Sequence, residues 1–137
     1  MRYDETETFD EMFFDALDVE GHGHARVFAK ITDGRTASCG YNKKKTHPFQ
    51  KRFGKNEDCI YLHAEIDAIK NWLRFCGDTE DLSDCDLFVM RIKRDGRRGP
   101  WVTGLSKPCE GCMRAIATFG IETVYYTEDN AKGFTCL

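Results

Sequence analysis

The sequence predicts a three-layer α/β fold, an α-β-α sandwich around a central mixed sheet. The spacing of the apolar residues predicts elements in the order helix, strand, strand, helix, strand, helix, strand. An Asp-Gly turn between the first two strands predicts an antiparallel hairpin. Helices separate the later strands, which implies parallel pairing through right-handed crossovers. A length of 137 residues with 41% hydrophobic residues suits one core. We therefore expect residues 1–137 to form a single domain.

The first part of the chain predicts a helix and a hairpin. Thr8-Phe9-Asp10-Glu11 has the form of a capping box, and apolar residues then follow at helical spacing. Apolar and polar residues alternate over residues 25–32, which predicts a strand, and residues 36–41 are predicted to form the return strand after Asp33-Gly34. Residues 42–58 read as a long loop rich in lysine, and loops of that length are often functional.

The second part predicts two helices and two strands. Residues 61–75 have a broad apolar face typical of a helix, and residues 87–92 are nearly continuously apolar, as in a buried central strand. A basic loop is expected over residues 93–100. A third helix starts at Pro108 and ends near Gly120, and the β-forming residues 121–127 follow it.

Composition limits the class of protein. The formal net charge is −3, so the chain as a whole has no bias towards polyanions. We see no long apolar run and no basic leader before an apolar stretch, so neither a membrane span nor a signal peptide is expected. Seven cysteines at irregular spacing fit a reducing cytosol better than a disulfide framework, which predicts a cytoplasmic protein.

Two short motifs carry the chemistry, His63-Ala64-Glu65 and Pro108-Cys109-Glu110-Gly111-Cys112. One imidazole and two thiolates make three protein ligands for Zn²⁺, which leaves the fourth position of a tetrahedral site to water. The pKa of that water falls to roughly 7 on zinc. Glu65 is a carboxylate that could accept the water proton and pass it to a substrate.

The spacing supports this hypothesis. Pro108 suits the first position of a helix, and Cys109 and Cys112 then share one face of its first turn. The positive end of the helix dipole lowers the pKa of a thiol placed there. Two alternatives remain open, a redox pair and a structural zinc site. A structural site needs a fourth ligand, for which Cys59 and Cys85 are the candidates.

The chain resembles the cytidine deaminase-like superfamily and, within it, the deoxycytidylate (dCMP) deaminases, including phage-encoded ones. The resemblance spans roughly residues 25–127. It is carried by Gly40-Tyr41-Asn42, residues 63–69, residues 108–117 and Gly120-Ile121. H-x-E followed by P-C-x-x-C is the signature of the zinc-dependent nucleobase deaminases.

This resemblance implies hydrolysis of dCMP at C4 of the cytosine to give dUMP and ammonia. His63, Cys109 and Cys112 would bind the zinc, and Glu65 would move the protons. It also implies a homo-oligomer, commonly a hexamer, acting on a small nucleotide. One departure is Asp67, because the dCMP deaminases often carry asparagine at this position of the motif.

The expected substrate-binding residues come partly from the family resemblance and partly from the charge of one segment. By resemblance, Asn42 matches the family's asparagine that holds the sugar, and Ala64 of the zinc motif is also expected to contact the substrate. Lys43, Lys45 and Arg52 lie in the basic segment that leads into the zinc motif, so we expect them to capture a phosphate. In this segment lysines replace the glycine- and proline-containing stretch that is usual in the family.

Three other functions stay open. A relative acting on a free nucleoside or a purine base would make the basic segment incidental. A single-stranded nucleic-acid deaminase acting on cytosine or adenine could use the basic loops to follow a backbone, but a pI of about 5.8 makes a nucleic-acid partner the weaker expectation. A zinc-stabilised binding module without activity would show four protein ligands on the metal.

Overall fold

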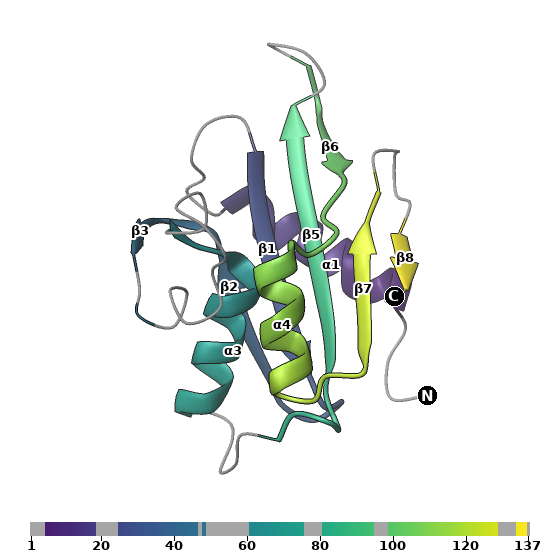
Figure 1. Cartoon of the computed structure of the whole chain (residues 1–137). Helices are drawn as coiled ribbons and strands as arrows, with labels where there is room; N and C mark the ends of the chain where they lie inside the picture. The colour runs from purple at the N-terminus through teal and green to yellow at the C-terminus, as the bar shows by residue number, and fades with distance from the viewer. Residues whose placement is uncertain are drawn as a thin grey trace.

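The computed structural model describes residues 5–18, 25–46, 48, 61–75, 81–94, 99–128 and 134–136. The helices are α1 (Glu5–Asp18), α3 (Ala64–Phe75) and α4 (Glu110–Thr118). The large sheet contains β1 (Ala25–Thr32), β2 (Ala37–Tyr41), β5 (Asp86–Arg94), β6 (Trp101–Gly104), β7 (Thr123–Thr127) and β8 (Phe134–Cys136), and β3 (Lys43–Thr46) pairs separately with β4 (Tyr61–Leu62). Helices α3 and α4 cover one face of this sheet and α1 the other, which confirms the three-layer prediction (Figure 1).

The sheet is mixed, as predicted. Its main order is β2-β1-β5-β7-β8. Strand β1 is antiparallel to both β2 and β5, whereas β5 and β7 are parallel, with β6 and α4 between them in the chain. Strand β6 pairs with β5 over Arg91–Arg94, beyond the residues of β5 that pair with β7. The central strand β5 therefore changes partner on one side at about Met90, and the chain that follows β6 leads directly to α4.

Hydrophobic side chains pack on both faces of the sheet. On the α1 face, Phe9 meets Phe88 edge to face with ring centroids 5.5 Å apart, and Phe88 stacks on Tyr125 at 4.8 Å. The larger cluster lies under α3 and α4 and includes Ile66, Ile69, Trp72, Leu87, Val89, Ile116 and Phe119. Alternate residues of β5 belong to alternate clusters, as the pleat of a strand requires.

The Asp33-Gly34 hairpin is confirmed. Strand β1 runs over the predicted residues 25–32, and Thr32 pairs with Ala37 across the turn. The Asp33 carboxylate accepts the backbone N–H groups of Arg35 and Thr36, each at 2.8 Å. Gly34 has φ 94°, a backbone conformation that glycine adopts without a steric penalty.

Several predicted boundaries were wrong. Helix α1 begins at Glu5, so the capping-box residues lie inside the helix and do not start it. Strand β3 occupies part of the loop expected over residues 42–58 and pairs with β4. Strand β5 extends to Arg94 into the expected basic loop, and residues 101–104 form a strand that the sequence did not indicate. Local propensity was overridden here by pairing with β5.

Trp101 is partly buried and packs against the α1-side cluster. The Arg26 and Arg94 guanidiniums also lie over its ring, at 4.7 and 4.9 Å from the ring centroid. Among the described helices, none combines the length and apolar character needed to cross a membrane.

Candidate metal centre

The first ligand residue stands immediately before α3. Strand β4 ends at Leu62, and the His63 carbonyl accepts the backbone N–H of Asp67 at 2.9 Å, the first bond of the helical ladder. His63 is therefore the N-cap of α3. The helix starts three residues later than the sequence predicted, because Tyr61 and Leu62 pair with β3 instead.

The other two ligand residues stand at the start of α4 in a comparable way. Cys109 is the N-cap, with extended backbone angles (φ −70°, ψ 171°), and its carbonyl accepts the N–H of Met113 at 2.8 Å. Cys112 lies on the first turn and is fully buried. Pro108 was expected at the first helical position but precedes the N-cap, because the backbone of Cys109 is still extended and the helix begins at Glu110.

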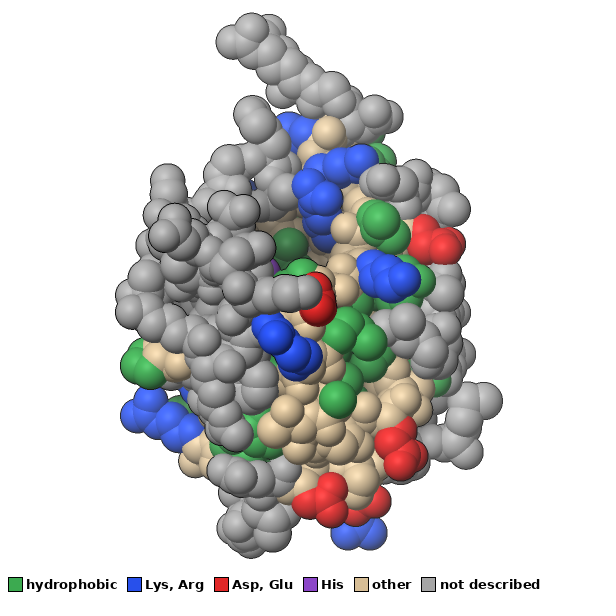
Figure 2. Space-filling model, viewed as in Figure 1, with side chains coloured by type: hydrophobic (Ala, Val, Ile, Leu, Met, Phe, Trp, Pro, Cys, Tyr) green, Lys and Arg blue, Asp and Glu red, His purple; other side chains and the backbone are tan. Residues whose placement is uncertain are grey.

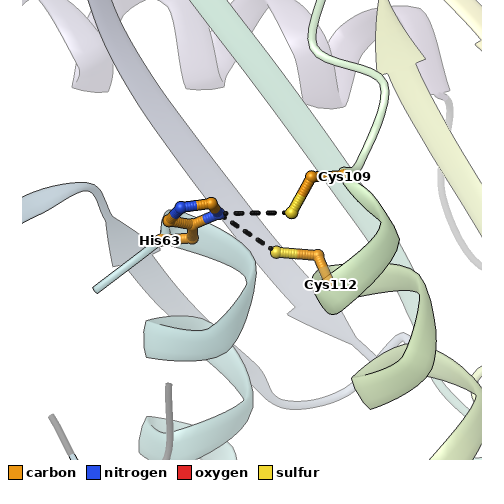
Figure 3. A group of neighbouring side chains, drawn as sticks. All are labelled: His63, Cys109 and Cys112. Carbon is orange, nitrogen blue, oxygen red and sulfur yellow. Dashed lines mark hydrogen bonds between the residues drawn. The ribbon is translucent and has the colours of Figure 1, made fainter. Parts of the chain in front are cut away.

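The three side chains converge, as the two motifs predicted. The His63 Nδ1 atom lies 3.5 Å from Cys109 Sγ and 3.4 Å from Cys112 Sγ (Figure 3). All the ligand atoms lie within 4.8 Å of one another. Tetrahedral zinc with Zn–N of about 2.0 Å and Zn–S of about 2.3 Å requires N···S separations of about 3.5 Å. Distances and donor chemistry both fit, so His63, Cys109 and Cys112 are positioned to bind zinc.

The group has three members within the described part of the chain. Cys85, one candidate for a fourth ligand, is buried in the hydrophobic cluster under α3 and α4 and is not among them. The other candidate, Cys59, lies outside the described residues. Three protein ligands are the number found in catalytic zinc sites, whereas structural sites usually have four.

The thiols and the imidazole perturb one another strongly. Hydrogen bonds with Cys112 and then His63 lower the pKa of Cys109 to about 3. The same contact with Cys109, together with burial, raises the pKa of Cys112. The hydrogen bond with Cys109 also raises the pKa of His63 against the effect of burial. Two sulfurs this close repel each other as thiolates, and a divalent cation between them removes that repulsion.

Glu65 points into the same region from the first turn of α3. Its side chain is only 5% exposed, and burial raises the pKa of its carboxyl group, an effect that its own backbone N–H and the charge of His63 oppose. Hydrogen bonding with Cys112 also lowers its pKa, which places the carboxylate beside the ligand set. A buried carboxylate beside a three-ligand metal site is arranged to exchange protons with a molecule bound there.

The predicted substrate residues fall in different places. Asn42 lies just after β2, half-buried, and its side-chain oxygen accepts the N–H of Val27 at 2.9 Å. Its amide nitrogen is the end of the side chain that can donate to a ligand. Ala64 is the first residue of α3 and is buried. Strand β3 contains Lys43 and Lys45, and Lys43 pairs with Leu62 beside His63. Arg52 lies outside the described residues.

Strand β2 packs directly on the start of α3, a contact that the sequence reasoning did not identify. A side chain at Gly40 would place its Cβ 2.3 Å from Ala68 N and 2.6 Å from Ala64 O. The N–H of Tyr41 is donated to the buried Asp67 carboxylate at 3.2 Å, and Lys70 pairs with that carboxylate at 3.0 Å. The Gly-Tyr-Asn triplet was a signal for this contact, because glycine is required where two backbones approach closely.

Two buried hydroxyl groups connect the segment before α4 to the sheet. Ser106 Oγ donates to Val89 O at 2.7 Å and accepts the N–H of Thr127 at 2.8 Å. Thr127 Oγ1 donates to Gly104 O at 2.7 Å and accepts the N–H of Arg91 at 3.1 Å. These bonds satisfy backbone groups at the point where β5 changes its partner from β7 to β6.

Comparisons with known proteins agree with this geometry. The sequence model of the cytidine and deoxycytidylate deaminase zinc-binding region matches residues 6–128. In structure, the chain is similar to the cytidine deaminase from Burkholderia pseudomallei, with a TM-score of 0.62 and 13% sequence identity over 98% of this chain and 92% of that one. At this identity the likeness concerns the fold. A search of curated proteins finds no match. Because the family match covers most of the chain and its zinc motifs, the protein belongs to the cytidine and deoxycytidylate deaminase family.

Proposed function

We propose that this zinc-dependent deaminase acts on dCMP, converting dCMP and water to dUMP and ammonia. The convergence of His63, Cys109 and Cys112, with Glu65 buried beside them, is the observation that carries the reaction type. The basic segment that contains β3 supports a phosphorylated substrate, because β3 pairs with the strand that ends beside His63.

In this mechanism a zinc ion on the three ligands would supply the acidity that makes water nucleophilic at neutral pH. Glu65 accepts a proton from that water, donates it to N3 of the cytosine, and then transfers the second water proton to the departing amino group. The bond from the water oxygen to C4 forms, and the bond from C4 to the amino nitrogen breaks. Burial of Glu65 beside the ligands keeps this proton exchange local and excludes bulk water.

The remaining chain would position the nucleotide. Asn42 donates its side-chain amide N–H to the sugar, while its oxygen accepts the Val27 N–H and so fixes the orientation of the side chain. Ala64 forms an apolar wall at the start of α3 against which the base packs. Lys43, Lys45 and Arg52 contribute positive charge for the phosphate.

The test is ammonia release by the zinc-loaded protein on dCMP, with deoxycytidine alongside and Glu65→Gln as the matched variant. The glutamine has the same shape but carries no transferable proton, so we expect zinc to remain bound and turnover to fall by at least about 100-fold. Zinc content measured on both proteins separates loss of chemistry from loss of the metal. Turnover that survives in Glu65→Gln would exclude Glu65 as the proton carrier.

Other outcomes would redirect the proposal. Equal turnover of deoxycytidine and dCMP would make the substrate a nucleoside, and turnover of neither would favour a purine base. Binding to single-stranded nucleic acid that weakens steeply with salt would favour a polynucleotide substrate. A homo-oligomer, as large as a hexamer, and a cytoplasmic location complete the proposal. Sedimentation velocity tests the assembly, and reduced thiolate ligands suit the cytoplasm.

A further inference from the structure

The central strand β5 carries a basic side chain on the face where the metal centre lies. Its residues alternate between the two hydrophobic clusters, with Phe88, Met90 and Ile92 on the α1 side and Leu87 and Val89 on the side of α3 and α4. Arg91 comes two residues after Val89, so its side chain belongs to the side of α3 and α4. The register agrees, because Arg91 pairs with Val27, which packs against the same cluster as α3 and α4.

The pairing places Arg91 just beyond the starts of both helices. One row of the sheet contains Gly40, Ala29 and Val89, where Gly40 contacts the first turn of α3 and the Val89 carbonyl accepts Ser106 Oγ in the segment before α4. The next row on this face contains Asn42, Val27, Arg91 and Gly104. Two residues along a strand advance about 7 Å. Arg91 therefore lies one row beyond the row that contacts the two helix starts, in the row of Asn42.

The surroundings of Arg91 leave its charge available. Its stem runs over Gly104, whose missing Cβ would lie 3.3 Å from Arg91 Cδ and 3.5 Å from Lys93 Cδ. Glycine at this position gives room for two basic side chains. Arg91 is half-buried, and within the described part of the chain its guanidinium makes no hydrogen bond or ion pair. Lys and Arg side chains gather over the same ends of β5 and β6 in the space-filling view (Figure 2).

We propose that Arg91, with Lys93 beside it, binds the phosphate of a nucleotide substrate directly, while Lys43, Lys45 and Arg52 add positive charge from the segment that follows Asn42. A partly desolvated guanidinium is stabilised by an anion, and its planar donors match two phosphate oxygens. The inference rests on the proposed function and assigns its substrate class: the base enters at the metal centre, the sugar meets Asn42, and the phosphate lies over β5. The sequence alone did not indicate a binding role for Arg91, because this residue lies within an apolar run that predicts a buried strand.

The experiment compares Arg91→Gln and Arg91→Lys with Arg35→Gln. Arg35 is an exposed arginine in the β1–β2 turn and controls for loss of one positive charge. For each zinc-loaded protein, kcat/KM is measured on dCMP and on deoxycytidine. We expect Arg91→Gln to lower the ratio of the two values, dCMP over deoxycytidine, roughly 10- to 100-fold. Arg91→Lys should recover part of the loss, and Arg35→Gln should leave the ratio as in the unchanged protein.

A second readout does not depend on turnover. Inorganic phosphate should raise the midpoint of thermal unfolding of the unchanged chain and of Arg35→Gln, but not that of Arg91→Gln. Substrate ratios that match across all variants, or equal phosphate stabilisation in Arg91→Gln, would overturn the assignment. If Arg91→Gln does not fold, Arg91→Lys decides, and a ratio equal to that of the unchanged protein counts against Arg91. If no protein deaminates either substrate, the proposed function fails, while phosphate stabilisation still decides the anion site.

Discussion

Helices α3 and α4 begin in the same way, but the sheet holds their starts by different contacts. Each has a metal-ligand residue at its N-cap, His63 or Cys109, and the Cys109 side chain makes no capping hydrogen bond to α4. Serine, threonine, aspartate and asparagine are the usual N-cap residues, because their side chains accept free N–H groups. Here the side chains of the two cap residues lie close together, with His63 Nδ1 3.5 Å from Cys109 Sγ. The N-cap side chain of α4 therefore adds no capping bond, and contacts with the sheet support the starts of both helices.

The start of α3 is held by backbone packing, and the start of α4 by hydroxyl groups. At α3, β2 touches the first turn through Gly40, and the Asp67 carboxylate accepts the Tyr41 N–H. At α4, Ser106 and Thr127 connect the preceding segment to three strands. The two helix starts should therefore respond differently to mutation. The contact between β2 and α3 has no space for an added side chain, whereas the contacts before α4 are separate hydrogen bonds that can be removed one at a time.

The largest effect is expected from Gly40→Ala. The added carbon would meet backbone atoms of α3, which cannot rotate away, so α3 must shift from β2. We expect the free energy of unfolding to fall by about 3 kcal/mol or more. Gly104→Ala is the matched control, because its new carbon meets only the flexible stems of Arg91 and Lys93, and its cost should stay within about 1 kcal/mol. Urea unfolding of both variants makes the comparison, and equal losses would contradict it.

An intermediate effect is expected at the start of α4. Ser106→Ala leaves the Thr127 N–H and the Val89 carbonyl without their hydroxyl partner in a buried place, at a cost of about 1–3 kcal/mol. Thr127→Val should lower the free energy of unfolding by a similar amount, because Gly104 O and the Arg91 N–H lose their hydroxyl partner.

A double-mutant cycle tests whether the two hydroxyl groups act as one unit. They lie 3.0 Å apart, so the double variant should lose less stability than the two single losses added together. Simple additivity would mean that each hydroxyl group supports its own strand alone. Faster zinc release from both single variants, measured with a chromogenic chelator, would link these bonds to the position of Cys109.

The smallest effect is expected from Asp67→Asn. The amide oxygen can still accept the Tyr41 N–H, and the Lys70 side chain is 24% exposed, so water can solvate its ammonium group once the carboxylate is gone. The free energy of unfolding should change by no more than about 1 kcal/mol. Asp67→Ala removes the acceptor as well and should cost about 2 kcal/mol. Thermal unfolding of the pair separates the two roles, and a larger loss in the asparagine variant would show that the charge is what holds β2.

The comparison also shows how far the sequence alone could lead. The β1–β2 hairpin and the end of α4 were predictable, because each depends on residues close in the chain. Gly120, for example, has φ 79° and ends α4 with its N–H bonded to Ala117 O and the N–H of Ile121 bonded to Ile116 O. The zinc ligands were also predictable, because the residue types and their spacing define the chemistry before the fold is known.

Contacts between distant segments decided the rest. No local pattern indicated that β6 would pair with the end of β5, or that Ser106 would bond to Thr127, because such contacts depend on the register of strands far apart in sequence. Arg91 illustrates the same limit: the sequence showed one charge within an apolar strand, and only its pairing with Val27 revealed which face it occupies. Sequence by itself determined the ligands and the local turns, since these follow from neighbouring residues. Tertiary structure decided which side chains surround the candidate metal centre, since packing sets the distances between elements.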